Sequence, residues 1–208
     1  MTPAHVPRIL QWLLPGYVWR IPTSEKVLYL TFDDGPIPEV TPWVLDELAS
    51  HDAKATFFCI GRNSAAHPDI LARIRSEGHG LGNHTWDHPR GRTTPLPAYL
   101  ENVRRAQEWT NTPAFRPPYG SLTRSQAKVI RRSHRIVLWD VLSRDYDTRL
   151  DGAYCSRSVI RHARPGSIVV FHDSLKAAPR LRVALPAVLD HFSGRGFHFA
   201  PLPFAIPG

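Results

Sequence analysis

Two adjacent acidic residues follow an apolar run. Asp33 and Asp34 come directly after residues 27–32 (VLYLTF) and precede Gly35 and Pro36. Successive residues of a strand point to opposite faces, so both carboxylates can reach one pocket only if the strand ends there. One carboxylate could then bind a metal ion while the other acts as a general base. For the pair taken alone, a solvated turn is the alternative.

Two histidines lie four residues apart in the segment GNHTWDH. The spacing of His84 and His88 places both imidazoles on one face if the segment is helical. With one carboxylate they would form a facial triad with open positions, which suits zinc or another divalent ion such as cobalt, nickel or manganese. The spacing alone often arises by chance. The acidic residues after the first strand strengthen the prediction of a metal site.

The segment RPPYG begins with Arg116. Its two prolines lack backbone N–H donors and predict a stiff wall rather than a strand. Arg116 could bind a carboxylate such as Asp33 through its two-pronged guanidinium and hold that acid ionised. A backbone N–H in the wall could face a developing oxyanion. A structural turn with a surface arginine is the alternative.

Two further clusters contain an acid and a histidine. The segment WDVLSRDY supplies Asp140 and Asp145, and an aspartate can orient a catalytic histidine. His172 ends the apolar run SIVVFH and is followed by Asp173. A lone histidine at a strand end is usually a structural hydrogen-bonding group. Beside a metal site, His172 is also a candidate general acid.

The elements that would position these clusters alternate between strands and helices, which predicts an α/β fold with a parallel sheet. Thr41 and Pro42 are suited to begin the first helix. Because sites in such folds collect at the carboxyl ends of strands, five polar clusters at one edge indicate an enzyme. The pattern predicts strands at 27–32, 55–60, 81–83, 115–116, 135–140, 167–172 and 197–199, and helices at 41–51, 68–77, 97–110, 123–132, 152–163 and 181–192.

Composition excludes several classes of protein. The 208 residues are 42% hydrophobic and 21% charged, which is typical of a globular domain and not of a disordered chain. The net charge of +8 allows an anionic partner such as nucleic acid, a membrane surface or an acidic polymer, but a solvated basic surface is the simpler interpretation. Cys59 and Cys155 are too few for a disulfide framework, and we expect two buried free thiols rather than one bridge.

The amino-terminal residues 1–22 form a predicted aromatic-rich arm, and residues 23–208 a single catalytic domain. We expect Trp12, Tyr17 and Trp19 to pack on this domain, with an interfacial membrane contact as the alternative. The apolar run 9–14 ends at Pro15 without a cleavage site, so it does not match a secretory signal. No apolar stretch reaches the length of a membrane-spanning helix. The default expectation is a cytoplasmic protein.

The five clusters in this order resemble the polysaccharide deacetylases, the fourth family of carbohydrate esterases, also known as the nodulation-type chitooligosaccharide deacetylase homology domain. TFDDGP with the downstream histidine pair is very specific, and VVFHD is moderately so. The similarity extends over about residues 27–199. It implies a distorted, incomplete parallel (β/α) barrel. It also implies metal-dependent removal of N- or O-acetyl groups from sugars.

The resemblance also implies a role for each position that matches the family pattern. Asp33 would be the general base, and Arg116 would brace it. The divalent metal ion, most simply zinc, would be held by Asp34, His84 and His88.

On the side of the leaving group, the resemblance implies that His172 protonates the amine and that Asp145 tunes His172. The backbone N–H of Tyr119 would help to stabilise the oxyanion. The walls of the acetyl and sugar pocket would come from Pro118, Trp139, Tyr146 and Val170. Two of these depart from the usual pattern, because the family usually has Trp where Tyr146 stands and Leu where Val170 stands. Tyr146 therefore leaves the shape of the pocket open.

Three hypotheses about function follow. The first is a metal-dependent hydrolase that removes N-acetyl groups from N-acetylglucosamine-containing saccharides of the peptidoglycan or chitin type. The second is a deacylase of a small amide, a glycolipid or another acyl substrate. The third is a non-catalytic protein that binds glycans or nucleic acid through its basic surface. The intact set of acid, base and metal ligands favours a carbohydrate substrate and no nucleic acid, while the oligomeric state stays open.

Overall fold

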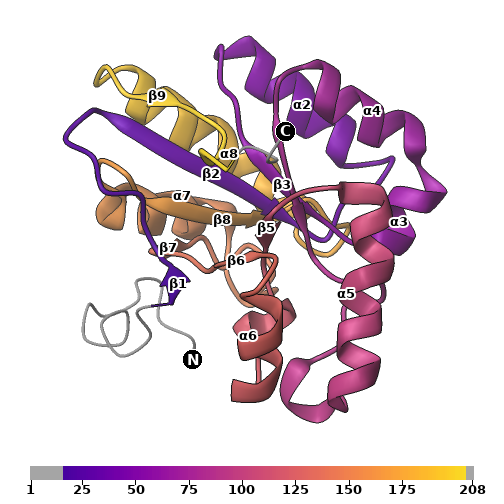
Figure 1. Ribbon diagram of the computed structural model, residues 1–208. Coiled ribbons are helices and arrows are strands. Elements are labelled where there is room, and N and C mark those ends of the chain that lie inside the picture. The colour runs from indigo at the N-terminus through magenta and orange to yellow at the C-terminus, as the bar shows by residue number, and fades with distance from the viewer. Residues whose placement is uncertain (1–15, 205–208) are drawn as a thin grey trace.

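The structure, a computed structural model, describes residues 16–204. Its strands form one curled sheet with helices packed on the outside (Figure 1). Strand order is β1-β6-β5-β4-β3-β2-β8-β7, and β9 pairs with β2 beside this path. The paired strands are parallel. The predicted fold class, a distorted and incomplete (β/α) barrel, is confirmed.

The strands and helices occupy most of the predicted ranges, with ends shifted by up to three residues. The strands are β1 (Tyr17–Val18), β2 (Val27–Asp33), β3 (Thr56–Cys59), β4 (Gly80–Asn83), β5 (Ala114–Phe115), β6 (Arg135–Val137), β7 (Val141–Leu142), β8 (Ile168–His172) and β9 (His198–Phe199). The helices are α2 (Thr41–Ser50), α3 (Gly61–Ala66), α4 (Pro68–Ser76), α5 (Leu96–Thr110), α6 (Arg124–Ile130), α7 (Gly152–His162) and α8 (Ala178–Ser193), with short 3₁₀ turns η1 (Gly91–Thr93) and η2 (Pro118–Gly120).

The predicted single strand at 135–140 is wrong. The chain leaves β6 after Val137 and begins β7 at Val141, and these two strands lie in different parts of the sheet order. The residues between them cross from one end of the strand order to the other, and we call this crossing the seam of the barrel. Leu138 N–H donates to Val18 C=O, and Asp140 N–H donates to Ile168 C=O. The stretch therefore supplies two separate strands, β6 beside β1 and β7 beside β8. Hydrophobicity alone does not show where one strand ends and the next begins.

Strand β2 is buried at all seven positions. Its side chains alternate between the two faces of the sheet. Leu28, Leu30 and Phe32 join the apolar cluster that packs under the helices, while Val27 and Tyr29 join a second cluster inside the barrel. Along this inward face the next two positions are Thr31 and Asp33. The barrel interior thus changes from apolar to polar toward the carboxyl end of β2.

The beginning of α2 differs from the prediction that Thr41 caps it. The residue at the N-cap position is Val40. The Thr41 hydroxyl instead accepts a hydrogen bond from Ile37 N–H at 2.8 Å and donates one to Asp173 Oδ2 at 2.6 Å. The side chain therefore ties the helix to the loop after β2 and to the end of β8.

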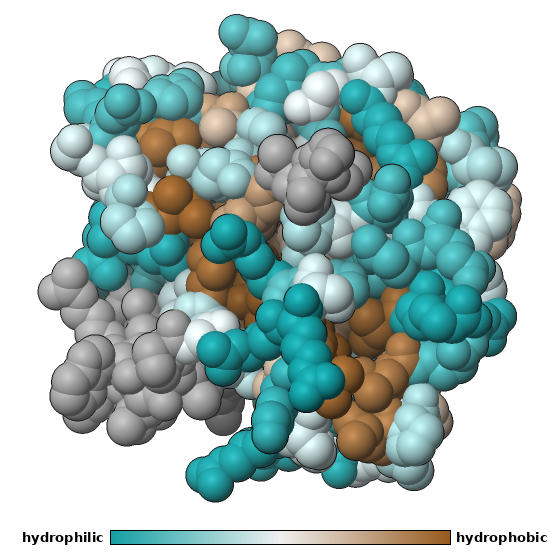
Figure 2. Space-filling view, viewed as in Figure 1, coloured by the Kyte–Doolittle hydropathy of each residue, from teal (hydrophilic) through white to brown (hydrophobic). Residues whose placement is uncertain are grey.

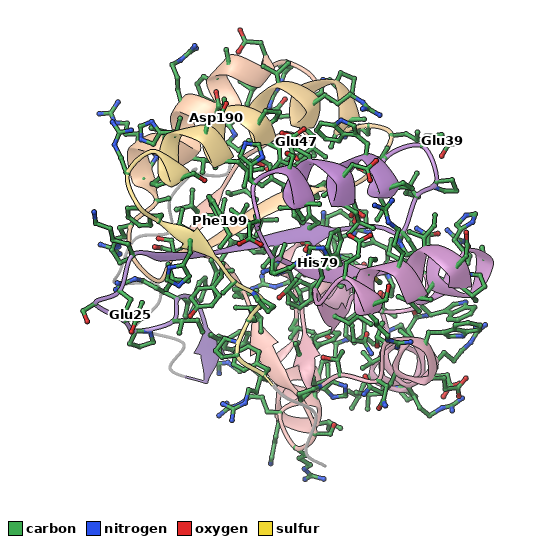
Figure 3. All side chains as sticks on the ribbon, turned by 90° about the horizontal axis from the view of Figure 1, so that it is seen from above. Glu25, Glu39, Glu47, His79, Asp190 and Phe199 are labelled. Carbon is green, nitrogen blue, oxygen red and sulfur yellow. The ribbon has the colours of Figure 1, made fainter. Side chains whose placement is uncertain are left out.

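The two ends of β2 mark the two edges of the barrel. In Figure 3, Glu25 and Glu39, which flank β2 in the sequence, lie on opposite sides of the molecule. Glu47 of α2 and Asp190 of α8 lie near each other in this view, and His51 Nε2 contacts Asp190 at 3.0 Å. Asp33, which ends β2, and Asp34, which follows it, belong to the edge on the side of Glu39, which is the carboxyl edge of the parallel sheet.

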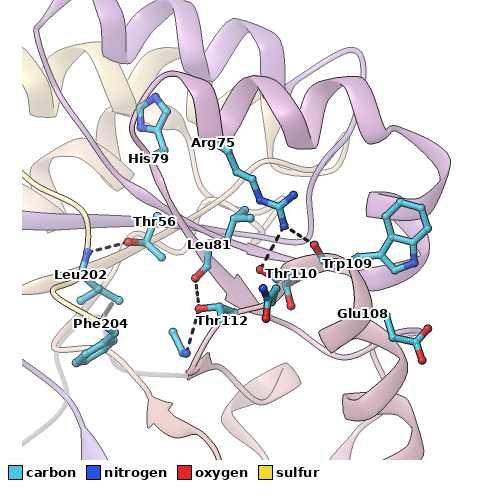
Figure 4. Close-up of a pocket in the computed structure, with 13 residues that line it drawn as sticks. Thr56, Arg75, His79, Leu81, Glu108, Trp109, Thr110, Thr112, Leu202 and Phe204 are labelled. Carbon is cyan, nitrogen blue, oxygen red and sulfur yellow. Dashed lines mark hydrogen bonds between the residues drawn. The ribbon is translucent and has the colours of Figure 1, made fainter. Parts of the chain in front are cut away.

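A cavity of about 600 Å³ lies at the opposite, amino edge, where β3, β4 and β5 begin (Figure 4). Two hydrogen bonds join residues of its wall: Leu202 N–H donates to Thr56 Oγ1, and Thr112 Oγ1 donates to Leu81 C=O. None of the residues in its wall belongs to the five polar clusters. This cavity is separate from the predicted site.

The surface and the amino-terminal region show few further features that bear on function. The face in Figure 2 is mostly hydrophilic, with an apolar patch beside α5 and α6. Of the predicted arm, Tyr17 and Val18 form β1 of the sheet, whereas Trp12 lies outside the described residues. No helix in residues 16–204 has the length and apolar character to cross a bilayer. Cys59 and Cys155 are buried free thiols, as predicted.

Gly82 is expected to be essential for packing inside the barrel. A Cβ atom at this position would overlap the ring of Phe58. Gly82→Ala should lower the free energy of unfolding by about 1–3 kcal/mol, because overpacking a filled core forces its neighbours to move. Urea denaturation would measure this change. Gly194→Ala is the control, since Gly194 has a helical φ of −62°, and a loss of stability at position 194 equal to that at position 82 would contradict the explanation.

Candidate active site

The five polar clusters meet at the carboxyl edge of the barrel. Asp33 is the last residue of β2 and His172 the last of β8, and the two residues are direct register partners on neighbouring strands. Asn83 ends β4 one residue before His84, and Phe115 ends β5 one residue before Arg116. The sheet thus places four of the five clusters around one space, and Asp145 of the remaining cluster joins them through its contact with His172.

Three predicted metal ligands lie together. Among the described residues, Asp34, His84 and His88 each offer a ligand atom, and these atoms lie within 4.8 Å of one another. Asp34 Oδ1 is 3.3 Å from His88 Nε2 and 3.8 Å from His84 Nε2. The Nδ1–H group of His84 donates to the Arg116 carbonyl at 2.7 Å, which leaves the lone pair of Nε2 for a metal ion. Asp34 and His88 are half-buried, so the site has an open side.

The segment that carries the two histidines is a loop, not the helix on which the sequence argument depended. Thr85 and His88 have φ angles of 66° and 59°, which a helix does not contain. The loop is held by local hydrogen bonds: Thr85 N–H donates to Asn83 Oδ1 at 2.9 Å, and His88 N–H donates to Thr85 Oγ1 at 3.1 Å. The histidines therefore meet because the backbone reverses direction between them.

Unusual backbone conformations concentrate at this edge. Seven non-glycine residues of the described chain have a left-handed φ, and five of them lie in the loops around the site. Such conformations cost free energy and persist where the surrounding structure fixes them, often at functional sites. The five residues are Asp34, Thr85, His88, Tyr119 and Arg144.

Asp33 is buried and faces a fully buried arginine. Arg116 Nη1 lies 2.6 Å from Asp33 Oδ1. Burial by itself opposes ionisation of Asp33, but the positive charge of Arg116, with smaller contributions from His84 and His172, lowers its pKa below the ordinary value. Asp33 is therefore ionised at neutral pH, as a proton acceptor must be.

Arg116 does not bind Asp33 through two nitrogens, as the sequence suggested. Its Nη1 also donates to Thr31 Oγ1 at 2.8 Å. Its Nη2 and Nε donate to the carbonyls of Leu138 and Val137 at 3.1 and 3.4 Å. Only Nη1 of the guanidinium donates to the Asp33 carboxylate, because Nη2 and Nε donate to backbone carbonyls at the seam.

His172 is paired with a buried aspartate. Its Nδ1 is 2.7 Å from Asp145 Oδ1, and its backbone N–H donates to Asp145 Oδ2 at 2.8 Å. Burial disfavours the charged imidazolium, but the Asp145 carboxylate outweighs burial and raises the pKa of His172 to about 9. His172 is therefore protonated at neutral pH. Burial and the neighbouring His84 lower the pKa of His88 to about 4, so His88 is neutral, as a metal ligand must be.

Comparison with known proteins agrees with this arrangement. A family model described as polysaccharide deacetylase matches residues 20–134 of the chain. The chain belongs to the polysaccharide deacetylase family. The resemblance inferred from the sequence is thereby confirmed, as is the predicted enzyme class, a polysaccharide deacetylase-like hydrolase.

Similar proteins cover nearly the whole chain. A peptidoglycan-N-acetylglucosamine deacetylase of Bacillus cereus is 33% identical over 196 residues, which are 90% of this chain and 71% of that protein. A chitooligosaccharide deacetylase of Azorhizobium caulinodans is 34% identical over 208 residues, which are 90% of this chain and 98% of that protein. The crystal structure of a peptidoglycan N-acetylglucosamine deacetylase in complex with 4-naphthalen-1-yl-N-oxidanyl-benzamide has a TM-score of 0.87 and 30% identity, and covers 95% of both chains.

The predicted pocket walls of this polysaccharide deacetylase differ in exposure. Tyr119 is 58% exposed, and its ring lies 4.7 Å from that of His88 and 4.4 Å from the guanidinium of Arg90. Tyr146 is half-buried, and its ring meets His172 edge-on at 5.1 Å. Tyr119 and Tyr146 are thus in contact with a predicted ligand and with the predicted acid.

The other predicted wall residues are buried or half-buried. Pro118 and Val170 are buried. Trp139 is half-buried, and Gly120 lies against its ring. Tyr119 is therefore the most exposed of the predicted wall residues.

Sequence reasoning assigned no role to two residues that contact the acidic loop. Asp173 accepts a hydrogen bond from Gly35 N–H, and Asn63 donates one to the Asp34 carbonyl. Asp173 could have been suspected from its place beside His172. Asn63 gave no signal, because its helix α3 (GRNSAA) has no apolar periodicity.

Removal of the buried arginine should destabilise the fold strongly. Arg116→Met leaves the Asp33 carboxylate buried without its countercharge, which costs about 3–5 kcal/mol of unfolding free energy. The double variant Arg116→Met/Asp33→Asn should recover part of that loss. Urea denaturation at pH 7 measures both. A double variant no more stable than Arg116→Met would show that the ion pair is not the cause.

The charge on His172 should depend on Asp145. In Asp145→Asn the pKa of His172 should fall from about 9 toward 6.5, because burial is then opposed only by the more distant carboxylates of Asp34 and Asp33. An NMR titration of the imidazole signals measures it. Asp190→Asn is the control, since that residue contacts His51 and should leave His172 unchanged.

The same pair should make stability depend on pH. The folded pKa of His172 lies above its ordinary value of 6.5, so the stabilisation is complete below pH 6.5 and is lost as the pH rises through about 9. In the metal-free protein, Asp145→Asn should flatten this decline. An unchanged decline would mean that other groups cause it.

Proposed function

We propose that this polysaccharide deacetylase removes the N-acetyl group from N-acetylglucosamine units of saccharides of the peptidoglycan or chitin type. The observation that carries the proposal is the register pairing of an ionised acid and a protonated histidine, Asp33 and His172, beside three clustered metal-ligand side chains. The names of the similar proteins support the substrate class, because they act on peptidoglycan N-acetylglucosamine and on chitooligosaccharide.

The donor set fits a divalent metal ion. Two imidazoles and one carboxylate with an open side suit zinc, and cobalt, nickel or manganese as alternatives. The tautomer of His84 is set by its hydrogen bond to the Arg116 carbonyl, which is the outer support that metal-binding histidines usually have. When bound, such an ion polarises the acetyl carbonyl and lowers the pKa of a water molecule.

Asp33 would act as the general base. It is ionised, buried and fixed by Arg116 at Oδ1, which leaves Oδ2 to take a proton from the attacking water. The water oxygen adds to the amide carbon, and a tetrahedral oxyanion forms. We propose that the backbone N–H of Tyr119 donates to this oxyanion.

His172 would act as the general acid. Its Nδ1 is held by Asp145, so its Nε2 is the nitrogen that faces the substrate. Proton transfer from Nε2 to the amide nitrogen accompanies cleavage of the carbon–nitrogen bond. The products are acetate and the free amine of the sugar. The elevated pKa of His172 keeps this proton in place at neutral pH.

Acetate release from N-acetylglucosamine oligomers of increasing length tests the proposal. Metal-stripped protein should be inactive and should regain activity with zinc or cobalt. Asp33→Asn should lower kcat by about 10²–10⁴-fold, the usual contribution of a general base, while metal affinity stays unchanged. Asp52→Asn is the matched control, because Asp52 is exposed and outside the site.

Two outcomes would contradict the proposal. One is metal-independent acetate release, and the other is full activity of Asp33→Asn. Metal binding at the three ligands without acetate release from any oligomer would instead favour a small amide, a glycolipid or another acyl substrate.

A further inference from the structure

The metal-ligand candidate Asp34 has a strained backbone. Its φ is 86°, in the left-handed region that non-glycine residues seldom adopt. The side chain can join His84 and His88 only if the backbone holds this turn. The conformation therefore needs support from outside the loop itself.

Four hydrogen bonds hold the backbone of residues 33–35. Two come from backbone groups: Asp173 N–H donates to Asp33 C=O at 3.1 Å, and Ile60 N–H donates to Gly35 C=O at 2.9 Å. The other two involve side chains. Asn63 Nδ2 donates to Asp34 C=O at 2.8 Å, and Gly35 N–H donates to Asp173 Oδ1 at 3.0 Å.

Asp173, which follows β8, holds the loop of residues 33–35 through its side chain. Its side chain is fully buried and also accepts a hydrogen bond from Thr41 Oγ1 at 2.6 Å. A Cβ atom at Gly35 would overlap the Asp173 carboxylate, so the loop backbone lies directly against it. The carboxylate thus connects the loop to the beginning of α2.

Asn63 holds the same loop through the Asp34 carbonyl. It also links that loop to the second loop that carries metal-ligand candidates, the one from His84 to His88. It belongs to α3, whose first backbone N–H groups donate to that second loop: Gly61 N–H to Thr85 C=O at 2.9 Å, and Arg62 N–H to Trp86 C=O at 3.2 Å. One short helix therefore contacts both the Asp34 loop and the loop from His84 to His88.

We propose that Asn63 and Asp173 are positioning residues that set the affinity of the metal site by holding Asp34 in its left-handed conformation. The inference rests on the proposed metal site, and it assigns metal affinity to two side chains that do not touch the metal. Loss of either contact lets the Asp34 backbone relax and moves its carboxylate away from the histidines. Outer residues that orient metal ligands typically contribute about 10–100-fold in affinity.

The dissociation constant for zinc or cobalt, measured by competition with a chromophoric chelator, tests this proposal. Asn63→Ala and Asp173→Ala should each weaken binding by about 10–100-fold and should change the visible spectrum of the cobalt form. Asp69→Ala is the control for Asn63, because Asp69 is an exposed residue of the next helix, α4, and belongs to neither ligand loop.

Asp173→Asn is the rescue variant. The amide oxygen can still accept from Gly35 N–H, and the amide nitrogen can donate to the Thr41 hydroxyl. It should therefore keep affinity within about threefold of the wild type, far from the 10–100-fold loss of the alanine variant. A purely structural role predicts lower melting temperatures of the metal-free alanine variants with unchanged metal affinity, and that result would overturn the proposal.

Failure of the inference and failure of the proposed function are distinguishable. His84→Ala should abolish metal binding. If the wild type binds metal, the variants weaken it as expected and no acetate is released from any oligomer, the positioning inference stands and the proposed substrate falls. If the wild type binds no metal, both are overturned.

Discussion

The buried guanidinium of Arg116 is the constraint on which the rest of the site depends. A charge without any exposed surface is tolerated only when it is paired and hydrogen-bonded. Arg116 meets this requirement with a carboxylate and a hydroxyl from β2 and with two backbone carbonyls at the end of β6, those of Val137 and Leu138. Those carbonyls lie at the seam, where the chain leaves one strand pair for another and the ladder is interrupted. The same cation therefore satisfies backbone carbonyls where the ladder is interrupted and holds Asp33 ionised.

The backbone of Arg116 extends this constraint to the metal ligands. Its carbonyl accepts the hydrogen bond that fixes the His84 ring, while its side chain fixes Asp33. One residue directly after β5 thus sets the positions of the proposed base and of one metal ligand relative to each other. Asp34 and His88, in contrast, stand on left-handed backbone and depend on neighbouring loops, on α3 and on the end of β8. The site thus combines buried groups held by Arg116 with two metal-ligand candidates on strained backbone at its open side. Substitutions around those two candidates can change metal affinity while the barrel stays folded.

The sequence allowed prediction of what depends on local pattern. The buried strand 27–33, the helices with apolar periodicity and the polar clusters at strand ends follow from hydrophobicity and residue type. The seam was not predicted, because residues 135–142 (RIVLWDVL) are mostly apolar, and only long-range pairing with Val18 and Ile168 divides them. The meeting of His84 and His88 was predicted from helical spacing, whereas left-handed residues bring them together. The role of Asn63 was not predictable from the local pattern, because it depends on a hydrogen bond to the Asp34 carbonyl, 29 positions away in the sequence.

The opposite charge states of Asp33 and His172 can act on one substrate because of the way the two strands are aligned. Each group has its own partner, Arg116 for the acid and Asp145 for the histidine, and each partner shifts the pKa of its group away from neutrality in the direction that catalysis needs. These shifts are useful only if both groups face the same space, and the parallel register that pairs Asp33 with His172 ensures this. A slip of one residue between β2 and β8 would send one side chain to the outer face, under the helices. The hydrogen bond from Asp173 to the Asp33 carbonyl continues that register beyond the last strand residue, so alignment of the proposed acid and base and support of the metal-ligand loop are the same feature of the chain.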